Sequence, residues 1–288
     1  MTRILLRAPL AIIVVWCGVG VGLAQVTTGL PPFGSFGGGP FDTVNLANLN
    51  VHLQIPIINK PGRGLPFYYS LAYDSAIWYP AGSQGSQTWT YINPTWGWSR
   101  LSDGSTGYIG YSATTTNGTC SVDHQFYSYT TYVYGPYTDA AGTNHGMFAQ
   151  TVYSTDQNCK ASVPTATYVS SDGSGYTLNV TNTVIFAVYT ASGTKIIPTE
   201  YASTRPSGEV TDTNGNSITV STTNGVTTYQ DTLGDTALTV SGPSNTSSPV
   251  YLCYPGGSGN GTCYSGGPTN TVHATLNYAE KTVQTAFG

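Results

Sequence analysis

The sequence predicts an all-β protein built from antiparallel strands and hairpins. No stretch after residue 25 shows sustained apolar spacing at i, i+3, i+4 and i+7. Short alternating runs bounded by Gly, Asn, Asp and Pro occur throughout instead, and these are typical of strands and turns. The composition agrees, because the 288 residues include 35 Gly and 22 Tyr but only 8% charged residues, against about 25% in an average domain.

The low charge also limits the classes of partner. The chain has 9 Lys and Arg against 13 Asp and Glu, a net charge of −4. Nucleic-acid binding by counterion release needs a basic face, so we expect no nucleic-acid partner. Solubility must then come from uncharged polar groups, which is a composition typical of extracellular β-proteins.

Residues 1–24 have the features of a cleaved signal peptide. Arg3 and Arg7 form a short basic start, an apolar stretch follows over residues 8–21, and the small-residue exit Gly22-Leu23-Ala24 comes last. A membrane anchor needs about 20 apolar residues, and this run is shorter and interrupted by glycine. We therefore expect a secreted or cell-surface protein with no membrane span after signal removal.

Four of the five cysteines follow the predicted signal. An even number of cysteines in an oxidising compartment predicts disulfides. Four cysteines permit three connectivities, and we favour the pairs nearest in sequence, which would stabilise the fold by about 4 and about 3 kcal/mol. No pair has the Cys-x-x-Cys spacing common in zinc sites, so we expect no metal. The favoured pairs are Cys120–Cys159 and Cys253–Cys263.

The mature chain divides by composition into three parts. Residues 25–43 are a Gly/Pro-rich lead-in that we expect to be extended. Residues 44–166 are predicted to form an aromatic-rich β domain, and residues 167–288 a β region rich in Thr and Gly.

The first strands of the aromatic-rich domain are the clearest local signals. Residues 51–58 and 67–73 alternate as strands do, and Lys60-Pro-Gly-Arg-Gly64 is the predicted turn between them. Pro56 lies inside the first run. Proline cannot donate a ladder hydrogen bond, so this strand should be an edge strand or be bent there.

Aromatic residues concentrate in residues 78–111 and 126–137. Flat rings with a polar tip could stack on sugars. In a charge-poor β-protein, however, such rings more often fill the core and form cross-strand pairs, which is the interpretation we favour. The residues that a glycan would contact are Trp78, Trp89, Trp96 and Trp98.

Two similar units stand 19 residues apart in the Thr/Gly-rich region. Residues 212–220 and 231–240 each begin with Asp-x-x-Gly and continue into a Thr-Val strand. The predicted turn residues are Asp212 with Gly215 and Asp231 with Gly234, and repetition of this kind indicates an elongated or coiled sheet. Calcium could bind if several such turns stacked their oxygens. A turn is favoured because the first unit lacks the glycine and the final Glu of a calcium loop.

No catalytic constellation is present. The sequence contains no Gly-x-Ser-x-Gly, His-Glu-x-x-His or phosphate-binding glycine loop. Asp123 and His124 are adjacent, but neighbouring strand residues point to opposite faces. The four histidines, His52, His124, His145 and His273, stand far apart and are expected on the surface or in loops. We therefore expect no enzyme, no catalytic residue and no cofactor.

Two stretches resemble the N-terminal lead-in of bacterial Rhs/YD-repeat proteins. One is residues 44–78, with its Ile55-Pro56 strand and Pro61-Gly-Arg-Gly64 segment, and the other is Trp96-Gly97-Trp98. The Asp-x-x-Gly units resemble the repeats of that family, although the Tyr-Asp pair is missing after both turns. The resemblance implies a large secreted or cell-surface protein whose repeats coil a β-sheet into a shell, often around a toxin, or serve in adhesion.

These observations predict an exported, non-enzymatic structural or interaction module that resembles the opening segment of such a shell. Its expected partners are other segments of a longer shell protein or neighbouring chains. The alternative is a glycan-binding adhesin that uses exposed Trp and Tyr. A secreted hydrolase has little support, because no set of acid, base and nucleophile is present.

Overall fold

The structure, a computed structural model, is all-β over the part of the chain that it describes, as predicted. The predicted signal peptide lies outside this part, as do Trp96, Cys120, Cys159 and His124. Among the described residues, no helix is long and apolar enough to cross a membrane. The described residues are 29–39, 41–81, 83, 85–91, 97–98, 106–119, 126–146, 149–154, 165–181, 184–200, 207–242, 248–256, 262–269 and 271–279.

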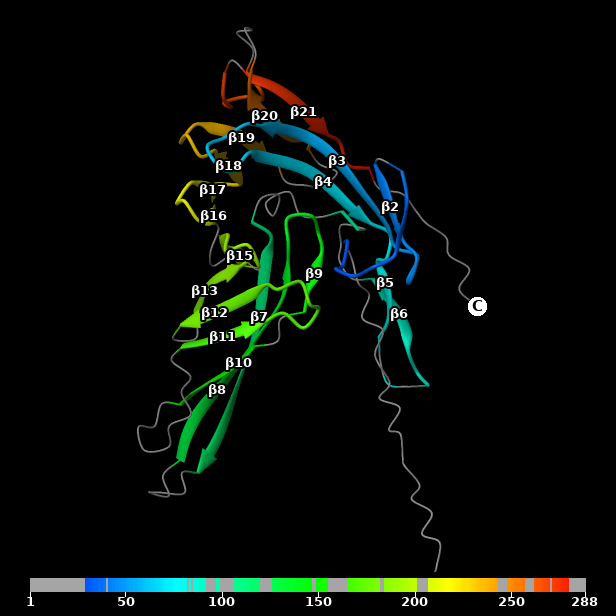
Figure 1. Ribbon diagram of the computed structural model, residues 1–288, viewed down its shortest axis with the longest axis vertical. Coiled ribbons are helices and arrows are strands. Elements are labelled where there is room, and N and C mark those ends of the chain that lie inside the picture. Colours follow the sequence, from blue (N-terminus) through cyan, green and yellow to red (C-terminus); the bar gives the residue numbers. More distant parts are fainter. Residues whose placement is uncertain are drawn as a thin grey trace, which may run out of the picture.

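A ten-stranded antiparallel sheet forms one layer of the molecule (Figure 1). Its strands follow one another in chain order, apart from β15, so that nearly every connection is a hairpin. The strands are β11 (Thr165–Val169), β12 (Thr177–Thr181), β13 (Val184–Tyr189), β14 (Lys195–Ile197), β16 (Ser207–Thr211), β17 (Ser217–Thr223), β18 (Val226–Gln230), β19 (Thr236–Ser241), β20 (Val250–Pro255) and β21 (Thr271–Leu276).

Three smaller sheets come mainly from the first half of the chain. The four-stranded sheet contains β1 (Phe36–Gly38), β2 (Asp42–Asn45), β3 (Val51–Lys60) and β4 (Phe67–Asp74). The five-stranded sheet contains β7 (Tyr108–Thr119), β8 (Phe126–Thr138), β9 (Asn144–His145), β10 (Ala149–Ser154) and β15 (Thr199–Glu200). The third is the hairpin of β5 (Trp78–Ala81) and β6 (Thr88–Tyr91).

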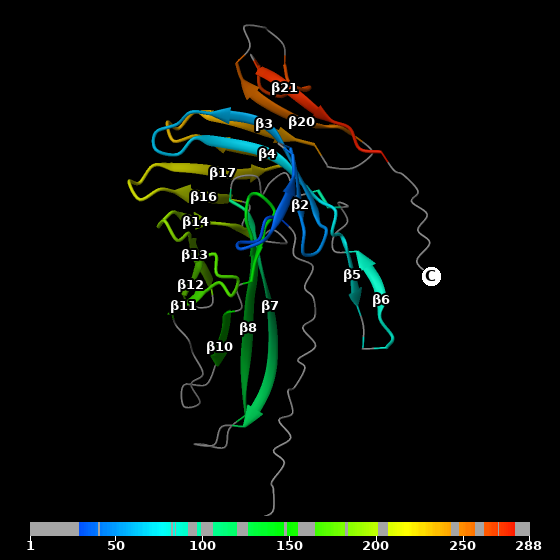
Figure 2. The same cartoon turned by 45° about the vertical axis from the view of Figure 1, so that its right-hand side comes forward.

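The four-stranded and the five-stranded sheet cover one face of the ten-stranded sheet. β4 packs its Phe67 and Tyr69 against β17–β20, and β7 and β8 pack Ile109, Tyr134 and Tyr137 against β12–β14. Figures 1 and 2 show both arrangements, together with the far ends of β7 and β8 running past β11. The core is thus a two-layer sandwich in which the inner face of one long sheet is covered by two short ones.

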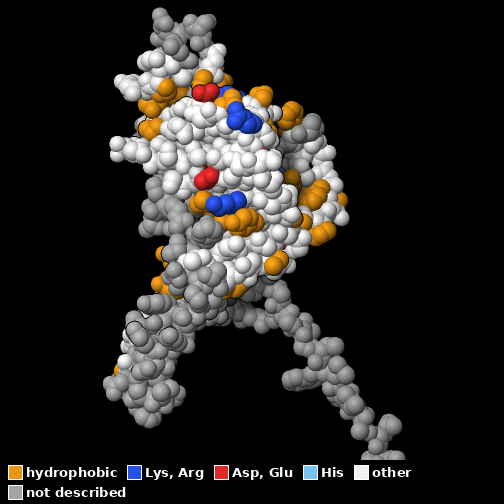
Figure 3. All heavy atoms as spheres, turned by 60° about the vertical axis from the view of Figure 1, so that its left-hand side comes forward, with side chains coloured by type: hydrophobic (Ala, Val, Ile, Leu, Met, Phe, Trp, Pro, Cys, Tyr) orange, Lys and Arg blue, Asp and Glu red, His pale blue; other side chains and the backbone are white. Residues whose placement is uncertain are grey.

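The inner face of the long sheet is apolar because the register of its strands places apolar residues of neighbouring strands side by side. A continuous row crosses five strands, and alternate residues point the other way. On that outer face lie mainly Thr and Ser, and charged side chains are sparse on the face shown in Figure 3. The row consists of Leu178, Val188, Ile196, Val210 and Ile218.

Local predictions for the first strands agree with the structure. β3 and β4 pair through the turn at residues 61–66, and the register of the pair shifts between Pro56 and Ile58. β2 pairs only with residues 51–53 of β3, so the proline lies beyond that ladder. The strand is therefore irregular at the residue that cannot donate a hydrogen bond.

The two predicted β regions share their cores. The expected boundary between residues 166 and 167 falls inside β11, and both apolar clusters combine side chains from either side of it. β15, from the second region, also pairs in parallel with β7 of the first. The division into two domains stays a prediction from composition.

Candidate functional site

The Asp-x-x-Gly units form hairpin turns of one type. In both turns the aspartate Oδ1 atom accepts hydrogen bonds from the amides two and four residues later, at 2.8 and 2.9 Å for Asp212 and at 2.9 and 3.1 Å for Asp231. Gly215 and Gly234 supply the positive φ angles of 85° and 84°. These features define a type I turn followed by a glycine bulge, which suits a three-residue hairpin loop.

Sequence reasoning missed two further turns of the same type. Asp139 accepts the amides of Ala141 and Thr143 on its Oδ1 atom, and Gly142 has a φ of 84°. Thr190 uses its hydroxyl instead to accept the amide of Thr194. The signal that could have found both is Asp or Thr followed three residues later by Gly, without the Thr-Val strand that we required.

Each turn has one cross-strand pair on the inner face at matching positions. Its first member stands two residues before the aspartate or threonine that begins the turn. Its second member stands six residues after that aspartate or threonine. In the Asp231 turn the second member stands seven residues after, because a bulge intervenes. In three turns the second member is Ile or Leu, but in the Asp139 turn it is His145. The pairs are Tyr137–His145, Val188–Ile196, Val210–Ile218 and Tyr229–Leu238.

The predicted turn at residues 60–64 docks on the two predicted repeat turns. The Nζ atom of Lys60 lies 2.5 Å from Oδ2 of Asp231, and the amide of Arg63 donates to Oγ1 of Thr232 at 2.6 Å. Gly64 lies so close to Asp212 that a Cβ atom there would come within 2.3 Å of Oδ2. The β3–β4 turn and the two repeat turns therefore form a single contact site.

The Asp231 carboxylate is stabilised as an anion at this site. Its side chain is fully buried. Burial alone would raise the pKa of this carboxyl, but the bonds from Lys60 and from the amides of Leu233 and Asp235 outweigh that effect and lower it. The ion pair between Lys60 and Asp231 thus joins the four-stranded sheet to the ten-stranded sheet.

Two of the histidines are buried, which corrects the expectation that all four lie on the surface or in loops. His52 is 2% exposed and His145 is 4% exposed, whereas His273 is exposed on β21. Both buried rings face aspartates that are distant in sequence, and this pairing is what allows a polar ring to be buried. Local pattern could not reveal the aspartate partners.

His145 lies between two carboxylates. Its Nδ1 atom is 2.7 Å from Oδ2 of Asp172, and its Nε2 atom is 3.2 Å from Oδ2 of Asp139. The ring also packs on Tyr176, at 4.3 Å between centroids, and on Tyr137, at 6.0 Å. Both nitrogens are occupied by carboxylates, so the ring is not placed to ligate a metal or act as a base.

The charges around His145 shift three pKa values. Burial alone would lower the pKa of His145, but the hydrogen bonds and charges of Asp139 and Asp172 outweigh it and raise the pKa. Burial tends to raise the pKa of Asp172, yet bonds from Ser174 and His145 lower it to about 2. The pKa of Tyr176 rises to about 12 through burial and through the two aspartates.

His52 belongs to a second buried polar cluster, centred on Asp74. The Oδ1 atom of Asp74 accepts from Asn50 Nδ2 at 2.6 Å and from the amide of Gly29 at 2.7 Å, and His52 Nδ1 lies 3.2 Å away. The Nε2 atom of His52 is buried without a hydrogen-bond partner among the described residues. The cluster fixes the lead-in at Gly29 to the end of β4.

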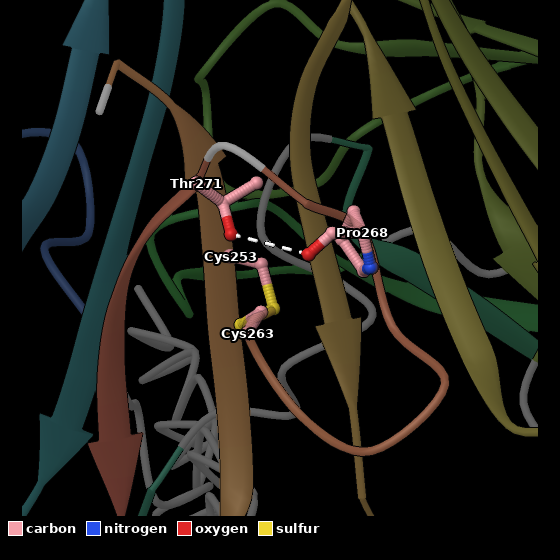
Figure 4. Close-up of a disulfide and its surroundings, with 4 residues drawn as sticks. All are labelled: Cys253, Cys263, Pro268 and Thr271. Carbon is pink, nitrogen blue, oxygen red and sulfur yellow. Dashed lines mark hydrogen bonds between the residues drawn. A yellow bond between two sulfur atoms is a disulfide. The ribbon is translucent and has the colours of Figure 1, made fainter. Parts of the chain in front are cut away.

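A disulfide joins Cys253 on β20 to Cys263, as the favoured pairing predicts (Figure 4). The amide of Cys263 donates to the carbonyl of Pro268 at 3.1 Å, which closes the loop that follows. Tyr264 in this loop stacks on Tyr251 of β20, with 5.7 Å between centroids. The bond therefore fastens residues 262–269 onto the last hairpin of the sheet. The other favoured pair, Cys120–Cys159, lies outside the described residues.

Of the tryptophans named for glycan contact, Trp78 and Trp89 lie on the two paired strands of the β5–β6 hairpin, Trp98 lies outside it, and Trp96 is outside the described residues. Trp78 begins β5 and is half-buried, Trp89 lies on β6 with 56% of its surface exposed, and Trp98 is 39% exposed. The ring of Trp98 packs on Tyr73 of β4, 5.2 Å between centroids. Among the described tryptophans Trp89 is thus the most exposed, and it lies on the β5–β6 hairpin, which projects from the rest of the molecule (Figure 2).

Residues of the Asp212 turn itself donate hydrogen bonds to both oxygens of the Asp212 carboxylate. Besides the two amide bonds to Oδ1, the Asn216 side chain donates to Oδ2 at 2.8 Å. The described residues contain no group of three or more His, Cys, Asp or Glu side chains that could hold a metal ion. The aspartate therefore orders the backbone of the turn, as an Asx turn does.

Comparison with known proteins identifies no relative. No protein-family model matches the chain, and neither a curated protein nor a solved structure matches it. The similarity to Rhs/YD-repeat proteins therefore rests on the residues of this chain alone.

Proposed function

We propose that the chain is an exported, non-enzymatic structural and interaction module, similar to the opening segment of an Rhs/YD-repeat shell or cell-surface protein. The observation that supports this most directly is the contact of the β3–β4 turn with the turns at Asp212 and Asp231. The first belongs to the stretch that resembles the lead-in of the family, and the others to the units that resemble its repeats. Their contact makes one architectural unit of both.

The expected partner is another β-strand, from a longer shell protein or from a neighbouring chain. β21 ends the ten-stranded sheet, and among the described residues it pairs only with β20. The strand Thr271–Leu276 contains no Lys, Arg, Asp, Glu or Pro, although natural edge strands are usually protected by such residues. An unprotected edge favours strand addition through main-chain hydrogen bonds.

Association at this edge can be tested with one added charge. Val272→Lys places a lysine on β21, and Thr228→Lys places the same charge on the central strand β18 as a control. If β21 is the assembly edge, analytical ultracentrifugation of the mature chain detects association that Val272→Lys weakens and Thr228→Lys leaves unchanged. A monomer at every concentration, or equal behaviour of the two variants, would argue against self-association through β21.

Export can be tested separately. Mass spectrometry of the exported protein should place its N-terminus at Gln25.

A glycan-binding function is the second candidate, and the exposed indole of Trp89 favours it. An exposed ring with a polar N–H suits stacking on a sugar face. Under this alternative, soluble glycans change the tryptophan fluorescence of the mature chain. The change is lost in Trp89→Ala and kept in Phe126→Ala, which removes a still more exposed ring from β8. If no glycan of a panel changes the fluorescence, the structural function remains as the single candidate.

A further inference from the structure

The contacts of His145 require a doubly protonated ring. Both of its nitrogens lie at hydrogen-bond distance from carboxylate oxygens, at 2.7 Å and 3.2 Å. An ionised carboxylate can only accept a hydrogen bond, and a neutral imidazole has a single N–H. Only the imidazolium can donate to Asp139 and Asp172 together, and each of those bonds is charge-assisted.

The two carboxylates belong to different sheets. Asp139 begins the turn between β8 and β9 in the five-stranded sheet, and Asp172 lies in the turn between β11 and β12 of the ten-stranded sheet. Among the described residues, Ser171 donates two further hydrogen bonds across this contact, both to the carbonyl oxygen of Gly146, from its amide at 2.7 Å and from its hydroxyl at 2.8 Å. Those bonds do not titrate, so the proton-dependent part of the link passes through His145.

The β8–β9 turn also contacts the lead-in. Asp139 Oδ1 orders the turn by accepting the amide of Thr143, and Thr143 Oγ1 accepts the amide of Leu30 at 3.0 Å. Gly29 lies so close that a Cβ atom there would come within 2.3 Å of the Thr143 backbone. Leu30 therefore depends for its amide hydrogen bond on the turn that His145 connects to the long sheet, whereas the Gly29 amide is held by Asp74.

We propose that His145 is a proton-controlled clasp: as an imidazolium it joins the β8–β9 turn to the β11–β12 turn, and loss of its proton as the pH rises releases this link and loosens the lead-in at Leu30. Deprotonation leaves one ring nitrogen with its lone pair against a carboxylate. That contact changes from attraction to repulsion, while the other hydrogen bond loses its charge.

The direction of the pH effect follows from the raised pKa of His145. A group with a raised folded-state pKa gives stabilisation that is complete below its unfolded value of 6.5 and is lost as the pH rises through the folded value. The groups that face the ring are Asp139, Asp172, Tyr137 and Tyr176. The pKa of Tyr176 is about 12, so this phenol stays neutral while the clasp opens.

Hydrogen exchange of the mature chain across neutral to alkaline pH tests the clasp. After correction for intrinsic base catalysis, exchange of the Leu30 and Thr143 amides should accelerate about tenfold in the wild type, as expected when a hydrogen bond to a charged group is lost. His145→Gln should show fast exchange at every pH, and His273→Gln, which removes an exposed histidine, should behave as the wild type. Equal pH profiles in the wild type and His145→Gln would overturn the proposal.

A second measurement keeps the test valid if His145→Gln does not fold. NMR titration of the wild-type protein should show that the His145 imidazole titrates above 6.5, and its titration should coincide with the change in amide exchange. A His145 ring that loses its proton below 6.5 would equally overturn the clasp.

Discussion

Lys60 forms an ion pair with Asp231 from 171 positions away in the chain, where the related turn uses its own residue. In the Asp212 turn, Oδ2 accepts from Asn216, four residues on. The matching position in the Asp231 turn is Asp235, a carboxylate that cannot donate when ionised. The Nζ atom of Lys60 lies 2.5 Å from that second oxygen instead. A change within one repeat thus creates the contact between the two layers.

Replacing Lys60 should destabilise the protein. Lys60→Met removes the donor and leaves a buried carboxylate oxygen unpaired, which costs about 1–3 kcal/mol or more for a charged group. Urea unfolding of the mature chain measures the loss. Arg63→Met is the matched control, because it removes a positive charge from an exposed side chain of the same turn.

The Asp212 turn suggests how to rescue that variant. Adding Asp235→Asn to Lys60→Met restores the side-chain donor found in the Asp212 turn, so part of the lost stability should return. If Lys60→Met costs no more than Arg63→Met, or if the second change gives no recovery, the ion pair does not join the layers.

Two glycines with similar backbone angles should respond differently to alanine. Gly64 and Gly215 have φ of 74° and 85°, so alanine at either position costs roughly 1–2 kcal/mol of backbone strain. Only at Gly64 would the new Cβ atom meet a neighbour, the Asp212 carboxylate at 2.3 Å; at Gly215 it meets open space. Gly64→Ala should therefore lower the thermal midpoint more than Gly215→Ala. Equal midpoints would contradict this prediction.

Local signals predicted the strands and turns of the contact site but not the site itself. Alternation and Pro-Gly chemistry located β3, β4 and their turn, and Asp-x-x-Gly located the turns at Asp212 and Asp231. Each of those signals depends on residues within one hairpin. Arg63 and Thr232, in contrast, are 169 residues apart, and no local pattern fixes which hairpins lie opposite each other. The meeting of the two motifs is a consequence of layer packing.

His145 also shows that local sequence patterns do not reveal distant contacts. Its position in the repeat was predictable in principle, since it stands six residues after Asp139, where Ile196 and Ile218 follow their own turns. The expectation of an exposed histidine was wrong because the residue that makes its burial possible, Asp172, comes from another sheet. Burial of a charged ring depends on such distant partners.

Asp172 should make the protein sensitive to acid. Its folded-state pKa is about 2, below the ordinary 3.8, because bonds from Ser174 and His145 outweigh the effect of burial. A lowered pKa gives stabilisation that is complete above 3.8 and is lost as the pH falls through about 2. In unfolding at a series of pH values, the stability difference between the wild type and Asp172→Asn should shrink over that interval. A constant difference would contradict the pairing with His145.

The disulfide should stabilise the last hairpin and also report on the pair that is not described. Cys253 and Cys263 are separated by 10 residues, for which the chain-entropy model gives about 3 kcal/mol. Cys253→Ala with Cys263→Ala should lower the unfolding free energy of the oxidised protein by about that amount. Adding a reductant to the double variant then tests Cys120–Cys159: a further loss of stability indicates that this second bond exists. If the double variant is as stable as the oxidised wild type, the bond at β20 does not constrain the fold.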